Sequence, residues 1–114
     1  MNRLMRELAR LQTLEPLRAG MSQLVVANAY GLALDEMRAP SRVSLKVAFA
    51  RQVAMYLAHV AFSMSMSAVA RGFGRDPSTA RYAILRVESL REDPELDRTL
   101  GFLESTLRGM AGDP

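Results

Sequence analysis

The 114-residue sequence contains no cysteine and no tryptophan, and His59 is its single histidine. Without thiolates or several imidazoles, one copy of the chain cannot form a disulfide, a cysteine nucleophile or a multi-histidine metal site. The Gly72–Gly74 run lacks both the lysine and the preceding strand that a phosphate-binding loop requires. Paired carboxylates at catalytic spacing are also missing. We therefore expect no enzymatic activity, no cofactor and no metal.

The sequence also lacks strand-like alternation, internal repeats and low-complexity tracts. Apolar residues instead recur every three or four positions, which predicts helices throughout. The longest stretch without formal charge, Gln52 to Ala70, has the length of a membrane span. Its glutamine, histidine and serines favour a buried helix followed by a second helix, and the N-terminus has no apolar run typical of a secretory signal. We expect a single cytoplasmic domain with no membrane partner.

Prolines and glycines divide the apolar pattern into helices. The first stripe comprises Met1, Leu4, Leu8, Leu11 and Leu14. Pro16 and Gly20 are expected to end this helix, and a short second helix is expected to stop at Gly31. One more helical turn is predicted before Pro40, and a long central helix of about five turns then begins near Val47.

The segment around Gly74 has the strongest local signals. Ser65 or Ser67 is expected to cap a short helix, and Gly74 stands where a left-handed C-terminal cap is needed. Asp76 and Pro77 then supply an N-cap carboxylate and a proline suited to the first helical position. Two helices joined by a short glycine turn are typical of a helix-turn-helix.

These patterns predict a compact all-α domain with a helix-turn-helix at residues 21–91. An N-terminal amphipathic helix is expected at residues 1–19, and a C-terminal helix, opened by Asp93 and Pro94, at residues 93–109. Both terminal helices carry leucine stripes that are too apolar to remain in water. They either pack on their own domain or pair two chains into a homodimer.

Charge is unevenly distributed along the chain. Residues 37–86 contain eight basic residues and one acidic residue, Asp76, whereas residues 87–114 contain seven acidic and three basic residues. Fourteen of the fifteen basic residues are arginine, whose planar guanidinium suits phosphates and guanine edges. A polyanion is therefore expected to meet the middle of the chain. An arginine-rich solvated surface is the alternative interpretation.

The helix expected after Asp76 has a first turn suited to DNA. Its free backbone N–H groups and positive dipole end favour a phosphate oxygen. Ser78, Thr79, Arg81 and Tyr82 lie on its first turn and a half, and short side chains there allow the helix to enter a major groove about 12 Å wide. Ordinary polar residues of a first helical turn are the alternative for Ser78 and Thr79.

Three motifs carry a family resemblance: RQVAMYLA at residues 51–58, GRDPSTA at residues 74–80, and Glu88 at the end of the following helix. Together they resemble the C-terminal DNA-binding domain of the bacterial replication initiator DnaA, over about residues 24–88. The resemblance implies that the helix after Gly74 enters the major groove of double-stranded DNA. It also implies that the basic loop before the central helix reaches the phosphates and the minor groove.

The resemblance assigns roles to individual residues. Ser78 and Thr79 match the family's base-contacting hydroxyl residues, Arg75 and Asp76 match its Arg-Asp pair, and Arg51 and Gln52 match its Arg-Gln pair near the phosphates. The sequence departs from the family at four positions: Pro77 and Tyr82 replace histidines, Val43 replaces a minor-groove arginine, and one glycine of a pair is missing. These departures favour generic duplex binding over recognition of the initiator's own DNA box.

We therefore predict a stand-alone protein that binds double-stranded DNA with some sequence preference and regulates transcription or replication-origin access by occupancy. The predicted DNA-binding residues are Arg42, Lys46, Arg51, Gln52, Arg75, Ser78, Thr79, Arg81 and Tyr82. The alternative is a helical protein-interaction adaptor that has lost base readout. Pro77 and Val43 favour this alternative.

Overall fold

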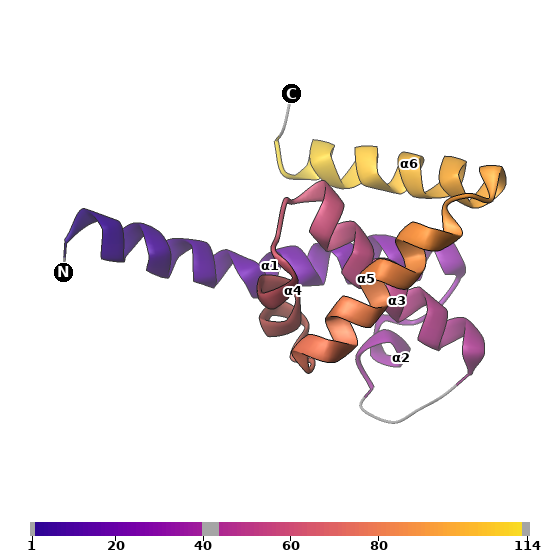
Figure 1. The fold of residues 1–114 in the computed structure, drawn as a ribbon, viewed down its shortest axis with the longest axis horizontal. Helices are drawn as coiled ribbons and strands as arrows, with labels where there is room; N and C mark the ends of the chain where they lie inside the picture. The colour runs from indigo at the N-terminus through magenta and orange to yellow at the C-terminus, as the bar shows by residue number, and fades with distance from the viewer. Residues whose placement is uncertain (1, 40–43, 113–114) are drawn as a thin grey trace.

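The computed structural model describes residues 2–39 and 44–112, without the side chains of residues 11–13. Within these residues the chain forms α1 (Arg3–Tyr30), α2 (Leu34–Arg38), α3 (Leu45–Ala61), α4 (Met66–Phe73), α5 (Pro77–Leu90) and α6 (Pro94–Met110). The predicted all-α fold is confirmed. Helix α3 lies at the centre, where it contacts all five other helices (Figure 1).

The helix-turn-helix is formed by α4 and α5, as predicted. The Ser65 side chain caps α4 by accepting a hydrogen bond from the Ala68 N–H at 3.1 Å. Gly74 ends α4 in the left-handed conformation, with φ 63° and ψ 37°. Asp76 then caps α5 through the Ser78 N–H, and Pro77 occupies the first helical turn. Both caps follow from local side-chain chemistry, which the sequence displays directly.

Helix α1 corrects the sequence prediction, because it continues without interruption through Pro16 and Gly20. Proline removes one backbone donor from the helix interior. Packing of the following turns compensates for this loss: Ala19 and Val26 are buried, and the buried Ser22 hydroxyl donates to the Ala54 carbonyl of α3 at 2.6 Å. The predicted helix end at Pro16 and Gly20 is therefore wrong.

The two terminal stripes have different environments. On α6, Leu100, Leu103 and Leu107 are buried against the chain's own core. The N-terminal half of α1 instead projects from the body as a separate rod (Figure 1), and Leu4 and Leu8 are exposed. Of the two alternatives for the terminal helices, packing on the chain's own domain therefore holds for α6 only.

A polar cluster fixes α6 and the end of α5 to α3. The Tyr56 hydroxyl of α3 donates to Glu88 and accepts from Arg91 at 3.0 Å. Arg91 also forms ion pairs with Asp97 and Glu104 of α6, at 2.6 and 3.2 Å. Desolvation acts to lower the pKa of Arg91, but its hydrogen bonds to Tyr56 and Asp97 outweigh it and raise that pKa above the ordinary value. The acidic C-terminal part is thus anchored by ionic contacts.

The uncharged stretch from Gln52 to Ala70 is divided between α3 and α4. Ser63, with φ 55°, lies in the break between the two helices. Among the helices of the described residues, none combines the length and apolarity needed to cross a membrane.

Replacement of Gly72 by alanine should destabilise the fold. A Cβ atom at residue 72 would lie 2.8 Å from the backbone oxygen of Glu15, so α4 and α1 would have to separate. We expect the free energy of unfolding to fall by about 1–3 kcal/mol, as for other overpacked sites, in chemical denaturation experiments. The matched control is Gly109→Ala, where a Cβ meets nothing within 4 Å. Equal stability of both variants would contradict the close packing of α4 on α1.

Candidate nucleic-acid interface

The first two turns of α5 present one apolar face and one polar face. Ala80, Ala83 and Ile84 are buried in the core. The helical period therefore turns the remaining side chains outward. The predicted contact residues on this outward face are Ser78, Thr79, Arg81 and Tyr82, all of which are exposed. The N-terminal end of α5 is thus open to solvent, with its hydroxyl and basic side chains grouped on one surface.

Arg75 lies in the turn between α4 and α5, close to Arg51 of α3. Burial lowers the pKa of Arg51, and repulsion from the positive charge of Arg75 lowers it further. Two guanidinium groups that repel each other favour the binding of an anion beside them. The structure therefore brings these two predicted DNA-binding residues together, although they are 24 positions apart in the sequence.

Arg51 has a second role that the sequence did not reveal. Its guanidinium donates to the carbonyl oxygens of Met37, Glu36 and Ala39, at 3.0, 2.8 and 2.7 Å. These acceptors lie at the C-terminal end of α2, where carbonyls have no partner inside the helix. Arg51 therefore fixes the point at which the basic loop leaves α2.

Gln52 is half-buried and accepts a hydrogen bond from the Arg86 guanidinium of α5. Arg86 also lies over the Phe49 ring, 5.8 Å from the ring centroid. Gln52 thus positions Arg86, which is itself exposed and lies four residues after Tyr82. Sequence reasoning missed Arg86 as a candidate, although the spacing of four from Tyr82 places both residues on the same side of α5.

The basic loop before α3 is described only in part. Ser44 caps α3 by accepting a hydrogen bond from the Val47 N–H at 3.2 Å, and Lys46 is exposed in the first turn. Arg42, predicted to contact DNA, lies outside the described residues, as does Val43. The structure therefore places one of the two predicted basic residues of this connection.

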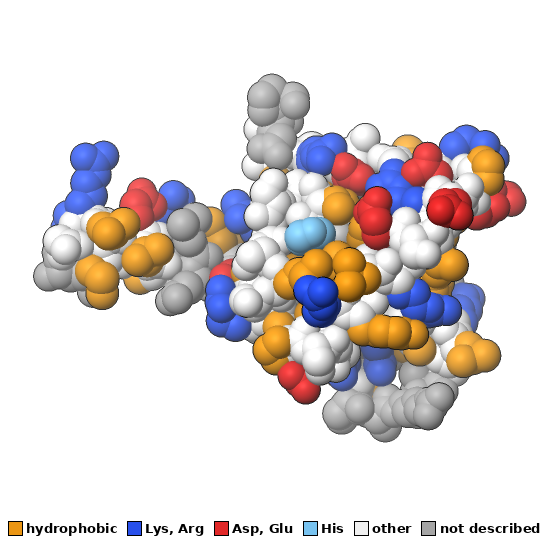
Figure 2. All heavy atoms as spheres, in the orientation of Figure 1, with side chains coloured by type: hydrophobic (Ala, Val, Ile, Leu, Met, Phe, Trp, Pro, Cys, Tyr) orange, Lys and Arg blue, Asp and Glu red, His pale blue; other side chains and the backbone are white. Residues whose placement is uncertain are grey.

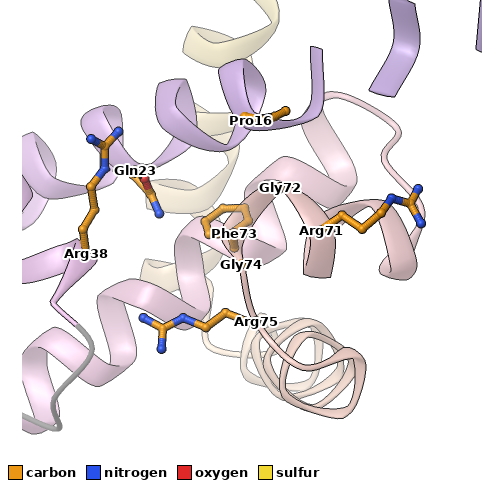
Figure 3. A pocket seen from close by; sticks show the side chains of 8 residues that line it. All are labelled: Pro16, Gln23, Arg38, Arg71, Gly72, Phe73, Gly74 and Arg75. Atoms are coloured by element: carbon orange, nitrogen blue, oxygen red, sulfur yellow. Dashed lines mark hydrogen bonds between the residues drawn. The ribbon is translucent and has the colours of Figure 1, made fainter. Parts of the chain in front are cut away.

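An open hollow of about 600 Å³ lies beside the turn (Figure 3). Its lining residues are Pro16, Gln23, Arg38, Arg71, Gly72, Phe73, Gly74 and Arg75. Arg38 donates to Gln23 at 3.0 Å, whereas Arg71 pairs with Glu15 at 2.9 Å. Figure 3 shows Arg75 extending toward the side of Arg38 and Arg71 pointing away from both. Arg38 therefore adds a cation, absent from our predicted set, on the same side of the turn as Arg75.

Some arginines of the described residues are paired with carboxylates, whereas the basic side chains nearest α5 are not. Carboxylates neutralise Arg10, Arg71, Arg91 and Arg108. In contrast, the side chains of Lys46, Arg75 and Arg81 form no ion pair with any residue that the structure describes. Figure 2 shows acidic side chains gathered over α6. The candidate interface therefore has positive charge that no neighbouring carboxylate compensates.

An outward helix that follows a left-handed glycine turn, on an all-helical core, defines the helix-turn-helix class of protein. Residues 23–87 match the family model described as the bacterial DnaA protein helix-turn-helix. The chain therefore belongs to this family, and the resemblance noted in its sequence motifs is confirmed.

Curated relatives agree with this assignment. The chain is 38% identical over 88 residues to the chromosomal replication initiator protein DnaA of Laribacter hongkongensis, covering 75% of this chain and 18% of the relative. It is 34% identical over 85 residues to DnaA of Deinococcus radiodurans, covering 74% of this chain and 18% of that relative. The chain thus spans less than a fifth of the length of these relatives.

Solved structures share the fold. A crystal structure of a DNA replication initiation factor superimposes with a TM-score of 0.77 at 29% identity, covering 90% of this chain and 32% of the other. A replication initiator DnaA bound to AMPPCP and single-stranded DNA gives a TM-score of 0.73 at 28% identity, covering 91% and 32%.

Substitution of Arg51 should separate its scaffold role from its charge. Because Arg51→Gln removes hydrogen bonds to three carbonyls of α2 and its C-terminal cap, we expect the free energy of unfolding to fall by about 1–2 kcal/mol. Arg81→Gln removes the same charge from a side chain without such contacts and should leave stability unchanged. Urea denaturation followed by circular dichroism measures both. Equal loss in the two variants would show that the α2 contacts contribute nothing.

Proposed function

We propose that this chain binds double-stranded DNA by placing the exposed face of α5 in the major groove. One observation carries the proposal: the N-terminal end of α5 is open to solvent, and Arg75 and Arg81 beside it form no ion pair with any carboxylate that the structure describes. A helix N-terminus and unpaired arginines both favour phosphate. Membership of the bacterial DnaA helix-turn-helix family supports the same conclusion.

The proposed contacts divide into two groups. Ser78, Thr79 and Arg81 face the base edges, where threonine suits a thymine methyl group and arginine suits guanine. Tyr82 extends beside them and is 62% exposed. The phosphate contacts come from Arg75, Lys46 and the loop residue Arg42. These contacts hold the register of α5 in the groove and carry no sequence information themselves.

Arg51 and Gln52 serve the interface in a different way. Their side chains hold the end of α2 and the Arg86 guanidinium, so they orient the groups that meet DNA. Arg51 also contributes positive charge next to Arg75. Pro77 occupies the first position of α5, and its ring has no hydrogen-bond donor that could contact a base. Base preference therefore depends on the residues that follow Pro77.

Acting on its own, such a chain would regulate transcription or access to a replication origin by occupying DNA at the nucleoid. The described residues include no group of three or more histidine, cysteine, aspartate or glutamate side chains that would hold a metal ion. Pairing of two chains through their terminal helices is a separate part of the proposal.

A protein-interaction adaptor is the second candidate function. It is favoured by apolar side chains that lie away from α5, namely Leu4 and Leu8 on α1 and Phe102 on α6, which are all exposed. An adaptor of this kind would not need the exposed basic side chains of Lys46 and Arg81. Measurement of DNA binding separates the two candidates.

Removal of single cations should weaken DNA binding in proportion to charge. We expect Arg75→Gln and Arg81→Gln each to lower duplex affinity, and to reduce by about one the slope of log affinity against log salt concentration. Fluorescence anisotropy with labelled genomic fragments at two salt concentrations measures this. The matched control is Arg98→Gln on α6, an exposed arginine outside the interface. No binding by the unmodified chain below about 10 μM at low salt would support the adaptor instead.

Base readout is tested separately. Thr79→Ala should reduce the preference for the best duplex over a random one by about 1 kcal/mol or more, because one base contact is lost while phosphate contacts remain. Competition binding with selected and scrambled duplexes gives this difference. Thr99→Ala, an exposed threonine of α6, is the control and should have no effect. If Thr79→Ala leaves the preference intact, α5 does not read bases through this residue.

A further inference from the structure

The hollow beside the α4–α5 turn has walls that donate hydrogen bonds (Figure 3). Arg38 of α2, Arg75 of the turn and Gln23 of α1 all line it. A smaller adjoining hollow shares Gln23 and Arg75 with it and is also lined by Arg51 of α3. Among the described residues that line either hollow, none is acidic. Guanidinium groups from three separate parts of the chain therefore lie around one amide.

Arg38 is held in a defined orientation against α1. Its Nε donates to the Gln23 amide oxygen at 3.0 Å. A Cβ atom at Gly20 would lie 3.5 Å from one of its terminal nitrogens. Because the Gln23 oxygen accepts this bond, the N–H groups of the same amide remain as donors. A guanidinium that is already oriented loses little conformational freedom when it binds an anion.

Acidic side chains near the hollow are engaged elsewhere. Glu15 accepts two hydrogen bonds from Arg71, at 3.1 and 2.9 Å, and Arg71 points away from the other two arginines of the hollow (Figure 3). Glu36 accepts from the Ala33 N–H at 3.0 Å. Asp76 accepts from the first turn of α5. These three carboxylates therefore have partners other than Arg38 and Arg75.

The hollow is also open enough to admit a ligand. Its volume of about 600 Å³ lies within the range of small-molecule sites. At Gly74 an added Cβ atom would meet nothing within 4 Å, so a ligand can approach the backbone of the turn. Burial, and then repulsion from Arg75, lowers the pKa of Arg51. An anion beside Arg75 would relieve this repulsion.

We infer that this hollow binds a phosphate group, with Arg38 and Arg75 as its charged contacts and Gln23 as a further donor. Arginine forks bind carboxylates and phosphates through paired hydrogen bonds. The donors of the hollow belong to separate walls. A tetrahedral phosphate directs oxygens to several walls at once, whereas a planar carboxylate offers two oxygens in one plane. The geometry therefore favours phosphate.

Two sources supply a phosphate of this kind: a DNA strand held by α5, and a free phosphorylated molecule. Arg75 directly precedes Asp76, the N-cap of α5, so the hollow adjoins the N-terminal end of that helix. Binding of a DNA strand here rests on the proposed function and extends the DNA contacts from α5 to α2. Binding of a free phosphorylated molecule does not depend on the proposed function.

The first experiment adds inorganic phosphate to the unmodified chain and follows NMR chemical shifts. We expect a saturable shift of the Gly74 backbone amide that sodium chloride at equal ionic strength does not produce. Gln23→Glu places a carboxylate beside Arg38 and should abolish this response. The matched control is Asn28→Asp, which makes the same change of charge on α1 at an exposed residue outside the hollow, and should retain the response.

The second experiment measures duplex binding by fluorescence anisotropy at two salt concentrations. If the phosphate belongs to DNA, Arg38→Gln and Gln23→Glu should each reduce by about one the slope of log affinity against log salt concentration. Arg38→Lys keeps the charge and should restore most of the slope, and Asn28→Asp should not change it. If duplex binding is unchanged while the response to inorganic phosphate is lost, the hollow serves a free phosphorylated molecule.

Two outcomes would overturn the inference. One is the absence of a saturable phosphate shift together with unchanged duplex binding by Arg38→Gln and Gln23→Glu. The other is a phosphate response that survives Gln23→Glu, because phosphate then binds elsewhere. Since Arg38 is exposed and Gln23 is half-buried, circular dichroism should show intact helices in both variants.

Failure of the proposed function gives a different result. In that case the unmodified chain binds no duplex, whereas inorganic phosphate still shifts Gly74 and Gln23→Glu still abolishes the shift. The inference then holds for a free phosphorylated molecule.

Discussion

The left-handed turn at Gly74 is the constraint on which the candidate interface depends. The Arg75 N–H donates to the Ala70 carbonyl at 2.9 Å, and the Gly74 N–H donates to Arg71 at 3.2 Å, which ends α4 and reverses the chain. Glycine adopts this conformation without steric cost. Asp76 then starts α5 at once, with its alanine face in the core and its hydroxyl and arginine side chains in solvent. A different turn would direct these side chains elsewhere.

Charge pairing gives the molecule two distinct sides. Around α6, Glu104 neutralises both Arg91 and Arg108, and this network anchors the helix to α3. Around α3 and α5, Arg86 contacts the Gln52 amide and lies over the Phe49 ring, and Arg51 donates to backbone carbonyls of α2 and its C-terminal cap. Arginines that stabilise the fold without losing their charge remain available to a polyanion. The exposed apolar side chains Leu4 and Leu8 of α1 and Phe102 of α6 are not among the proposed DNA-binding residues.

Local chemistry made most of the fold predictable. Ser65, Gly74, Asp76 and Asp93 act on residues two to four positions away, so their capping roles can be inferred from spacing alone. The continuity of α1 through Pro16 was not predictable in this way, because it depends on burial against α3. Likewise, the hydrogen bonds of Arg51 to α2 join residues that are 12 to 15 positions apart. The outward residues of α5 were predicted, and the spacing of Arg86 from Tyr82 indicated one more, whereas the position of Arg38 beside the turn emerged only from the packed structure. The division of the chain at residues 1–19, 21–91 and 93–109 stays a prediction.

Chemical-shift mapping by NMR, with backbone amides followed while a short DNA duplex is added, tests the central claim most directly. The account predicts that the largest shifts fall in the first two turns of α5, in the turn residue Arg75 and at the start of α3, with α6 unaffected. Shifts confined to α6 and to residues 3–10 of α1 would contradict this account. The absence of shifts at a duplex concentration that saturates ordinary non-specific binders would contradict it as well.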